Sequence, residues 1–561
     1  MNENRELRIE NLEPRIKPAG RRFWVTIALT LIFLVGLGLH LWRISYPPIP
    51  VFDEAHFATY AVDYLIGQAH LEIHPPLGKL IYAAVLRGAW GSADIPGWQF
   101  LEVRPSADPG RLTFARTADS FGDFPYVPLR ATAAVWGALL PLVIYWFART
   151  VGAGQIGSLL SALFVMLDNA FLTDQRFIFL NGMFLVLGFA ALAWYFRAQT
   201  LSYEVSHSVI PVSGSESNLP SPPPAPRLRR ASLLGKGGGA ELGSSALLAG
   251  ILWGLALGVK ITAVVFLGPI LLFWAAGRQS GRRVLAFGLA GLTVLVILYA
   301  LNQFFFSPQD QLNVWSTLGV LPDSALHIPA RWHAIQNGIA SAFVVLMELL
   351  VSVGGYVTPD GARHVLNSRW YEWLVGRGGF NLYQASTAPD SPRIALQGNL
   401  VLWYGALLAV LIALAAGLRN AIVRLHKEID SRTMGIAICA PSSTRGQIGN
   451  LRPLRRSVSE ASGNDKRGVP ERYNRTLIIL LGGYLASLAP FLVVTRSTFF
   501  YHYFPALCFA FVLLGWSIER LSATLSPGRR VWFIALTVLA VVTGFLLRIH
   551  LVYGVKPIWG S

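Results

Sequence analysis

Long apolar runs separated by polar connections dominate the chain. A helix needs about 20 apolar residues to cross the hydrocarbon core of a bilayer. On this measure the sequence predicts about eleven transmembrane helices, at 23–41, 130–149, 155–171, 177–196, 245–259, 262–277, 284–304, 399–418, 477–495, 503–518 and 531–550. Two further apolar segments, 74–90 and 338–353, are predicted to be amphipathic helices at the membrane surface. We therefore expect an all-α polytopic membrane protein.

Composition agrees with this pattern. Hydrophobic residues make up 53% of the 561 residues and charged residues only 14%, with a mean hydropathy of +0.48. These values exclude a soluble globular protein of this length. The two cysteines, Cys439 in a polar connection and Cys508 inside a predicted span, are not placed to pair, so no disulfide or cysteine-based metal site is expected.

Basic residues gather in every second connection. Lys and Arg near the ends of spans favour the cytoplasm, so we expect a cytoplasmic N-terminus. The connections that would then face the cytoplasm hold Arg227, Arg229, Arg230 and Lys236, then Arg278, Arg282 and Arg283, then the basic stretch 419–475, then Arg520, Arg529 and Arg530. The net charge of +17 is explained if these basic residues lie beside the anionic lipids of the inner leaflet. We therefore expect membrane lipids rather than nucleic acid as partners.

The same alternation predicts the domain organisation. The expected parts are a cytoplasmic N-terminus (1–22), an N-terminal membrane region (23–304) with a first outer loop (42–129), an extracytoplasmic loop (305–398) and a C-terminal membrane region of four helices (399–561). Two connections rich in Ser, Pro, Gly and Arg, 201–243 and 419–475, are predicted to be disordered cytoplasmic loops.

Polar residues that interrupt or border the spans fall mostly on the outer side in this topology. Ionisable groups at such positions are costly and are functional candidates. The candidates are Asp53, Glu54 and His74 in the first outer loop, Arg130 at the start of the second span, Asp168 and Arg176 between the third and fourth, Lys260 between the fifth and sixth, and Arg496, Tyr501 and His502 in the last outer connection. We expect them to form one outward-facing site at the edge of the bilayer.

The candidate residue types fit the transfer of a sugar from a lipid phosphate. A carboxylate can act as a general base toward an acceptor hydroxyl, and Arg or Lys can hold a phosphate and stabilise it as it leaves. Phosphate-binding Gly-rich motifs for soluble nucleotides are absent from the sequence. An outer pair of acids spaced to hold a divalent cation is also absent, so no cofactor and no metal are expected.

At these residues the sequence resembles a known family. "FDEAHF" followed by "HPPLGKL" is similar to the first-loop signature of the protein O-mannosyltransferases, membrane enzymes of the GT-C class that use a polyprenyl-phosphate-mannose donor. Similar blocks follow in order: "YVPLRATAAVWGALLPLVIYW", "LDNAFLTDQRFIFLN", "GLALGVKITAV", "SRWYEWLVGRGG" and "RSTFFYHYFPAL".

The resemblance implies inverting transfer of mannose to Ser or Thr hydroxyls of proteins crossing the membrane, on the extracytoplasmic face of the cell membrane. It places the family's catalytic acidic pair on Asp53 and Glu54, with Asp53 favoured as the base, and the family's essential arginine on Arg130. We expect the other candidates to bind substrate. Two departures stand out. Asn181 occupies a position where family members usually carry Asp, and the 302–398 connection has no inserted lumenal domain of the MIR type, as in the bacterial branch.

Two other functions stay open at this point. One is a GT-C enzyme that moves another lipid-phosphate-linked sugar to a glycolipid or envelope polymer. The other is a transporter of lipid-linked sugars without catalysis, which is disfavoured because transporters place charges at mid-membrane between broken helices. The expected partners are a lipid-linked donor, translocating acceptor proteins and, as an open alternative, a second copy in a dimer.

Overall fold

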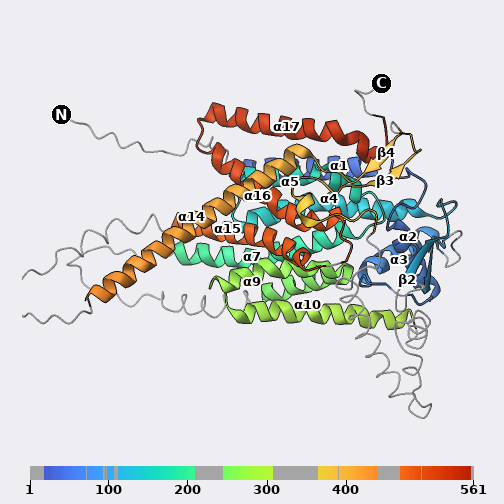
Figure 1. Cartoon of the computed structure of the whole chain (residues 1–561), viewed down its shortest axis with the longest axis horizontal. Helices are drawn as coiled ribbons and strands as arrows, with labels where there is room; N and C mark the ends of the chain where they lie inside the picture. Colours follow the sequence, from blue (N-terminus) through green and yellow to red (C-terminus); the bar gives the residue numbers. More distant parts are fainter. Residues whose placement is uncertain are drawn as a thin grey trace, which may run out of the picture.

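A computed structural model describes residues 18–70, 72–91, 95, 98–105, 112–208, 244–306, 364–388, 391–438, 468–494 and 496–556. Its long helices run side by side as a bundle, and its short helices and strands gather at one end (Figure 1). We call this the site end. The first half contains α1 Pro18–Leu41, α2 Glu54–Ile66, α3 Leu77–Trp90, α4 Tyr126–Val151, α5 Gln155–Met166, α6 Asn169–Asp174, α7 Asn181–Ser208, a helix at Ser244–Val259, η1 Ile261–Phe266, α9 Leu267–Ala275, α10 Gly281–Leu301 and η2 Asn302–Phe304. The second half contains α13 Trp370–Trp373, α14 Leu400–Ile438, α15 Gly468–Leu488, η5 Ala489–Leu492, η6 Phe500–Tyr503, α16 Phe504–Ser522 and α17 Pro527–Tyr553.

The predicted membrane protein of mainly helical structure is confirmed, although the count of eleven spans is not. Within the described residues, seven helices are long and apolar enough to cross a membrane, and three shorter apolar helices accompany them at Gln155–Met166, Ser244–Val259 and Ile261–Ala275. The predicted span 155–171 is interrupted, because α5 ends at Met166 and Asp168 caps the separate helix α6. The fourth predicted span begins later than expected, at Asn181.

Helix α14 is a correction to the predicted loops. The sequence predicts disorder over 419–475, yet α14 continues to Ile438 and α15 begins at Gly468. Residues 419–434 contain no Gly or Pro and many good helix formers, so the helix continues past its apolar part. Figure 1 shows α14 projecting beyond the other helices at the end opposite the site. Residues 209–243, 439–467 and 307–363, the last including the predicted surface helix 338–353, lie outside the described residues.

Two β-hairpins at the site end were not predicted by the all-α expectation. Strands β1 (Leu101–Pro105) and β2 (Leu112–Arg116) pair antiparallel, with Leu101 opposite Arg116. Strands β3 (Asn381–Gln384) and β4 (Arg393–Ala395) form the second hairpin. Both are short, so their alternation is too brief to stand out in an apolar sequence.

Close helix packing holds the bundle together. Helix α4 packs against α1, α5 and α7, while α16 packs against α5, α14 and α15. Where α5 meets α16, a Cβ on Gly157 would lie 2.9 Å from the backbone oxygen of Gly515, so small residues permit this approach. Helices α1, α10 and α17 keep large apolar side chains on their outer faces, as lipid contact requires; examples are Leu34, Leu289 and Leu539.

Candidate active site

The adjacent acids of the first outer loop occupy different positions on α2. Asp53 is the N-cap residue, and Glu54 is the first residue of the helix. Phe52, immediately before them, has a left-handed backbone with φ of 45°, which is costly for an aromatic residue. Glu54 is fully buried, whereas Asp53 is partly exposed.

Glu54 belongs to a closed ion pair with Arg130 of α4. Its Oε1 accepts from Arg130 Nε at 2.8 Å, and its Oε2 accepts from Arg130 Nη2 at 2.7 Å. The backbone N–H groups of Ile178 and Val51 donate to the same two oxygens, at 2.9 and 3.0 Å. Four donors therefore satisfy the carboxylate of Glu54.

Arg130 completes this arrangement, which we call the Glu54–Arg130 clasp. Its Nη1 donates to the carbonyl oxygens of Ile44 and Pro47 at 3.1 and 2.9 Å, and its Nη2 also donates to Ile49 at 3.2 Å. A guanidinium has five N–H donors, and these contacts account for all of them. The clasp joins the segment after α1 to α2 and α4, and it leaves Arg130 no donor for a ligand.

Asp53 is in the opposite situation. Among the described residues, its carboxylate makes no side-chain hydrogen bond as a helix cap or otherwise. Burial raises the pKa of Asp53 to about 7, an effect that Lys260 and Arg496 oppose and Glu72 reinforces. Asp53 therefore lies within electrostatic reach of two cations from distant parts of the chain. A carboxylate with such a pKa can accept a proton near neutral pH.

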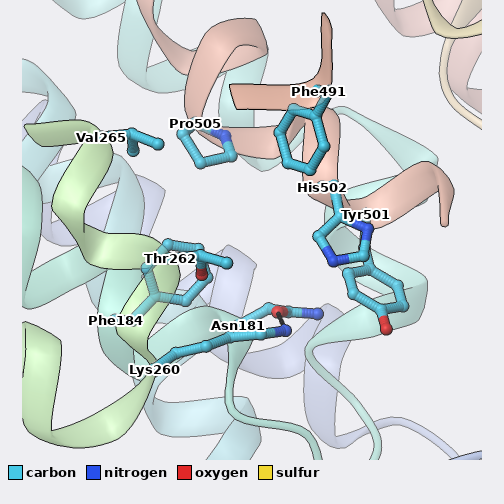
Figure 2. Close-up of a pocket in the computed structure, with 9 residues that line it drawn as sticks. All are labelled: Asn181, Phe184, Lys260, Thr262, Val265, Phe491, Tyr501, His502 and Pro505. Carbon is cyan, nitrogen blue, oxygen red and sulfur yellow. Dashed lines mark hydrogen bonds between the residues drawn. The ribbon is translucent and has the colours of Figure 1, made fainter. Parts of the chain in front are cut away.

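Lys260 reaches the site from the turn between Ser244–Val259 and η1. Its Nζ donates to Asn181 Oδ1 at 3.0 Å and lies 4.5 Å from the ring centre of Tyr501. Asn181 Nδ2 in turn donates to Asp174 Oδ1 at 2.8 Å. Figure 2 shows Lys260 and Asn181 lying side by side, with Tyr501 and His502 facing them from η6.

A pocket opens beside this lysine. The space, about 250 Å³ when the part open to solvent is included, is lined by Asn181, Phe184, Lys260, Thr262, Val265, Phe491, Tyr501, His502 and Pro505. In Figure 2, Lys260 and Asn181 lie along the bottom of the pocket with Tyr501 and His502 at the right, and Val265 and Pro505 form an apolar wall at the top. A pocket with one cation and apolar walls suits an amphipathic anion.

Glu72 and His74 form a second polar pair near Asp53. Glu72 Oε1 and His74 Nδ1 are 2.8 Å apart, and Lys79 Nζ donates to the backbone oxygen of His74 at 2.7 Å. Burial works to raise the pKa of Glu72, but His74 and Lys79 outweigh it and hold that pKa below its usual range. Burial lowers the pKa of His74 against the opposing effect of Glu72. Glu72 therefore supplies a fixed negative charge beside the candidate base.

Asp168 and Arg176 make structural contacts. Asp168 caps α6 through the N–H groups of Ala170 and Phe171, and its Oδ2 accepts from Asn399 N at 3.0 Å and Trp403 Nε1 at 2.7 Å. Arg176 donates to four backbone oxygens, those of His40, Trp42, Arg43 and Val552. Both residues therefore join the first half of the chain to α14 or α17.

The ten predicted site residues thus divide into two groups. Asp53, His74, Lys260, Arg496, Tyr501 and His502 share contacts or electrostatic interactions around the pocket. Glu54, Arg130, Asp168 and Arg176 are engaged with the protein itself, and their predicted roles in catalysis and binding stay untested. Glu72, Asp174 and Phe52 were not among the predicted site residues. The two acids could have been included on the same signal as the others, since each is an acid bordering an apolar segment. Within the described residues, no three His, Cys, Asp or Glu side chains are grouped to hold a metal ion.

Comparison with known proteins places the chain in a family. The family model for dolichyl-phosphate-mannose-protein mannosyltransferase matches residues 30–210, and the model for the C-terminal four-helix membrane region of protein O-mannosyltransferase matches residues 447–558. Together they cover just over half of the chain. The chain belongs to the protein O-mannosyltransferase family. The resemblance found in the sequence motifs is thereby confirmed.

Curated members of the family match over part of their length. Dolichyl-phosphate-mannose–protein mannosyltransferase 4 of Schizosaccharomyces pombe is 30% identical over 173 residues, which is 30% of this chain and 20% of that protein. Protein O-mannosyltransferase 1 of Drosophila melanogaster is 29% identical over 177 residues, covering 31% of this chain and 18% of the relative. The matched part is thus about a fifth of these relatives.

A solved structure of the family shares the fold over almost the whole chain. The Saccharomyces cerevisiae protein O-mannosyltransferase Pmt1–Pmt2 complex, whose structure holds the sugar donor, superposes with a TM-score of 0.60 at 14% identity. The match covers 95% of this chain and 90% of that one. The fold match therefore agrees with membership in the protein O-mannosyltransferase family, whose fold is of the GT-C type.

Proposed function

We propose that this protein transfers mannose from a polyprenyl-phosphate carrier to Ser or Thr hydroxyls of proteins. Family membership supports the donor and the class of acceptor. The observation that carries the proposal concerns Asp53, whose carboxylate has no side-chain hydrogen bond among the described residues and interacts electrostatically with Lys260, a residue that lines the amphipathic pocket. A base and a phosphate-binding cation on either side of a sugar are what such a transfer requires.

In this proposal the acceptor oxygen attacks C1 of mannose from the side of Asp53. The acceptor hydroxyl loses its proton to the Asp53 carboxylate, a new C1–O bond forms, and the bond from C1 to the phosphate oxygen breaks. The polyprenyl phosphate leaves with the bonding electrons, and Lys260 with Arg496 stabilises its negative charge. Attack opposite the leaving group inverts the configuration at C1.

The remaining predicted residues take supporting roles. We assign Tyr501 and His502 to the pocket wall, and His74 to the Glu72 pair that sets the charge around Asp53. Phe184, Val265 and Pro505 offer apolar contact to the first part of the prenyl chain. Because the contacts of Glu54, Arg130, Asp168 and Arg176 are with the protein, we assign these four to positioning rather than to direct contact with the donor.

We also propose that the site faces the outside of the cell membrane and the N-terminus faces the cytoplasm, as the basic connections suggest. Single cysteines in a Cys439→Ala/Cys508→Ser background test this. Ser386 is exposed between β3 and β4, so a cysteine there should react with an impermeant reagent added outside the cell. Thr524 is exposed between α16 and α17, so a cysteine there should react only after permeabilisation. The reverse pattern would contradict the orientation.

Transfer itself is tested with purified protein, polyprenyl-phosphate-mannose and a Ser/Thr-rich peptide. Mass spectrometry should find a hexose on the peptide, none on a matched peptide with Ala at every Ser and Thr, and little with the Asp53→Asn protein. A hexose found on added glycolipid and never on peptide would support the alternative GT-C activity instead. Movement of the donor across vesicles without any product would support a transporter. The predicted dimer and independence from metal stay predictions.

A further inference from the structure

We propose that Asp174 and Asn181 act together as one counter-charge for Lys260, so that the pair must contain one carboxylate and one amide. The proposal rests on the proposed function, because the ligand of Lys260 is taken to be the phosphate of the donor. Asp174 and Asn181 are positioning residues in this scheme. They act on the donor through the lysine.

The three side chains form a buried line of hydrogen bonds. Asp174 is fully buried, and Asn181 and Lys260 are 3% and 5% exposed. Asp174 Oδ1 accepts from Asn181 Nδ2 at 2.8 Å, and Asn181 Oδ1 accepts from Lys260 Nζ at 3.0 Å. An ionised carboxylate only accepts hydrogen bonds and an ammonium group only donates them, so the amide between them can adopt only this orientation.

This line holds Lys260 while leaving its charge available. An ammonium group has three N–H donors, and one of them goes to Asn181 Oδ1. Because Asn181 is neutral, Lys260 is oriented at the pocket by an amide, and no carboxylate among the described residues is its hydrogen-bond partner. The negative charge of Asp174 acts from one residue further away. Burial lowers the pKa of Lys260 to about 8, and the carboxylates of Asp53 and then Asp174 oppose this shift.

A second carboxylate beside Asp174 would be electrostatically unfavourable. Asp174 Oδ2 is buried without a hydrogen-bond partner in the described structure. Its negative charge is therefore not offset by a further hydrogen-bond donor. An acid at position 181 would place two carboxylates in contact with each other and cancel the charge that Lys260 offers to phosphate. Exchanging the two residues would keep one carboxylate, one amide and both hydrogen bonds.

The test measures binding of polyprenyl-phosphate-mannose to four proteins: wild type, Asn181→Asp, Asp174→Asn and the double variant. The donor phosphate is a diester, so its charge is constant over the pH range used. Asn181→Asp should weaken binding about 10- to 100-fold at pH 8, the size expected for a unit charge in contact with the phosphate-binding cation. The double variant Asp174→Asn/Asn181→Asp should bind within a few-fold of wild type.

A pH series separates a charge effect from a packing effect. In the Asn181→Asp variant the new carboxyl group is neutral when protonated, and it can then donate to Asp174 and accept from Lys260 as the amide does. The affinity of this variant relative to wild type should therefore recover as the pH falls, whereas Asn181→Leu, which also loses the link, should show no recovery. The other charged groups that act on Lys260, namely Asp53, Glu72 and Arg496, are present in every variant, so the comparison with wild type separates their effect from that of position 181.

Each outcome decides the proposal. Wild-type affinity in Asn181→Asp, or no recovery in the double variant, would overturn it. If Asn181→Asp cannot be obtained folded, a folded double variant that binds donor supports the shared charge, and failure of both to fold overturns it. Loss of the proposed function itself would be seen separately, as a wild-type protein that does not bind the donor.

Discussion

The sharpest prediction compares two adjacent substitutions of the same kind, Asp53→Asn and Glu54→Gln. Each replaces a carboxylate by an amide of equal size. At Asp53 no side-chain hydrogen bond is lost among the described residues, so the fold should be unchanged. Removing a general base typically lowers the rate by about 10²–10⁴-fold. We expect Asp53→Asn to give normal amounts of folded protein with a transfer rate reduced on that scale.

Glu54→Gln should instead damage the fold. Each oxygen of Glu54 accepts one hydrogen bond from Arg130 and one from a backbone N–H. Glutamine has one oxygen, so its NH₂ group must face two donors and leave the charge of Arg130 unpaired. Breaking a buried ion pair on one side costs about 3–5 kcal/mol, against a total stability of about 5–15 kcal/mol for typical domains. The substitution would therefore remove a substantial part of the free energy of unfolding.

The assay measures thermal unfolding of the purified proteins in detergent together with transfer per molecule of folded protein. We expect a lowered unfolding temperature and poor recovery for Glu54→Gln, with substantial activity in the fraction that folds. The control Glu54→Leu/Arg130→Met removes both charges and should be more stable than either single variant. If Glu54→Gln were as stable as wild type but transferred mannose a hundredfold more slowly, the structural role of the Glu54–Arg130 clasp would be refuted. Glu54 would then be a catalytic candidate again.

Three further predictions follow from the described contacts. Because the base must be deprotonated and burial raises the pKa of Asp53 to about 7, the transfer rate should rise roughly tenfold from pH 6 to pH 8; a flat profile would exclude Asp53 as the base. Glu519 accepts hydrogen bonds from Gly154 N at 2.6 Å and Ile156 N at 3.1 Å, so Glu519→Ala should destabilise the start of α5 by about 1–3 kcal/mol. Unfolding and donor-binding measurements on one preparation should show this loss with unchanged donor affinity. Deletion within 212–240 should leave both insertion and transfer near wild type, and loss of folded protein would show that this segment packs on the bundle.

Hydropathy predicted the membrane helices where one apolar run forms one helix. Helices α1, α4 and α10 lie within a few residues of their predicted bounds. Hydropathy failed at α5 and α6, because the stretch around Asp168 is apolar enough to look like one helix although the Asp168 carboxylate caps a separate helix. It also failed for the end of α14, since polar composition alone does not distinguish a solvated helix from a loop.

The sequence grouped the candidate site residues, but the contacts of each residue within the fold came only from the structure. Sorting polar residues by side grouped Asp53, Lys260 and Tyr501 from segments far apart in sequence, and in the structure Lys260 contacts the ring of Tyr501 and interacts electrostatically with Asp53. Asp53 and Glu54 have different contacts because one caps α2 and the other is its first residue. The contacts of Arg130 depend on the path of the chain at 44–49. Such tertiary contacts have no signature in a single sequence.

Asp168 has a consequence for the time at which the chain can complete its fold. Its Oδ2 accepts from Asn399 and Trp403, which follow it by 231 and 235 residues. At synthesis rates of about 5–20 residues per second, these donors emerge about 10–50 seconds after Asp168. Over that interval the first half of the protein holds a carboxylate oxygen that no upstream residue in the described structure satisfies. Nascent chains halted between residues 210 and 399 should therefore be more exposed to membrane quality control than chains halted after residue 403.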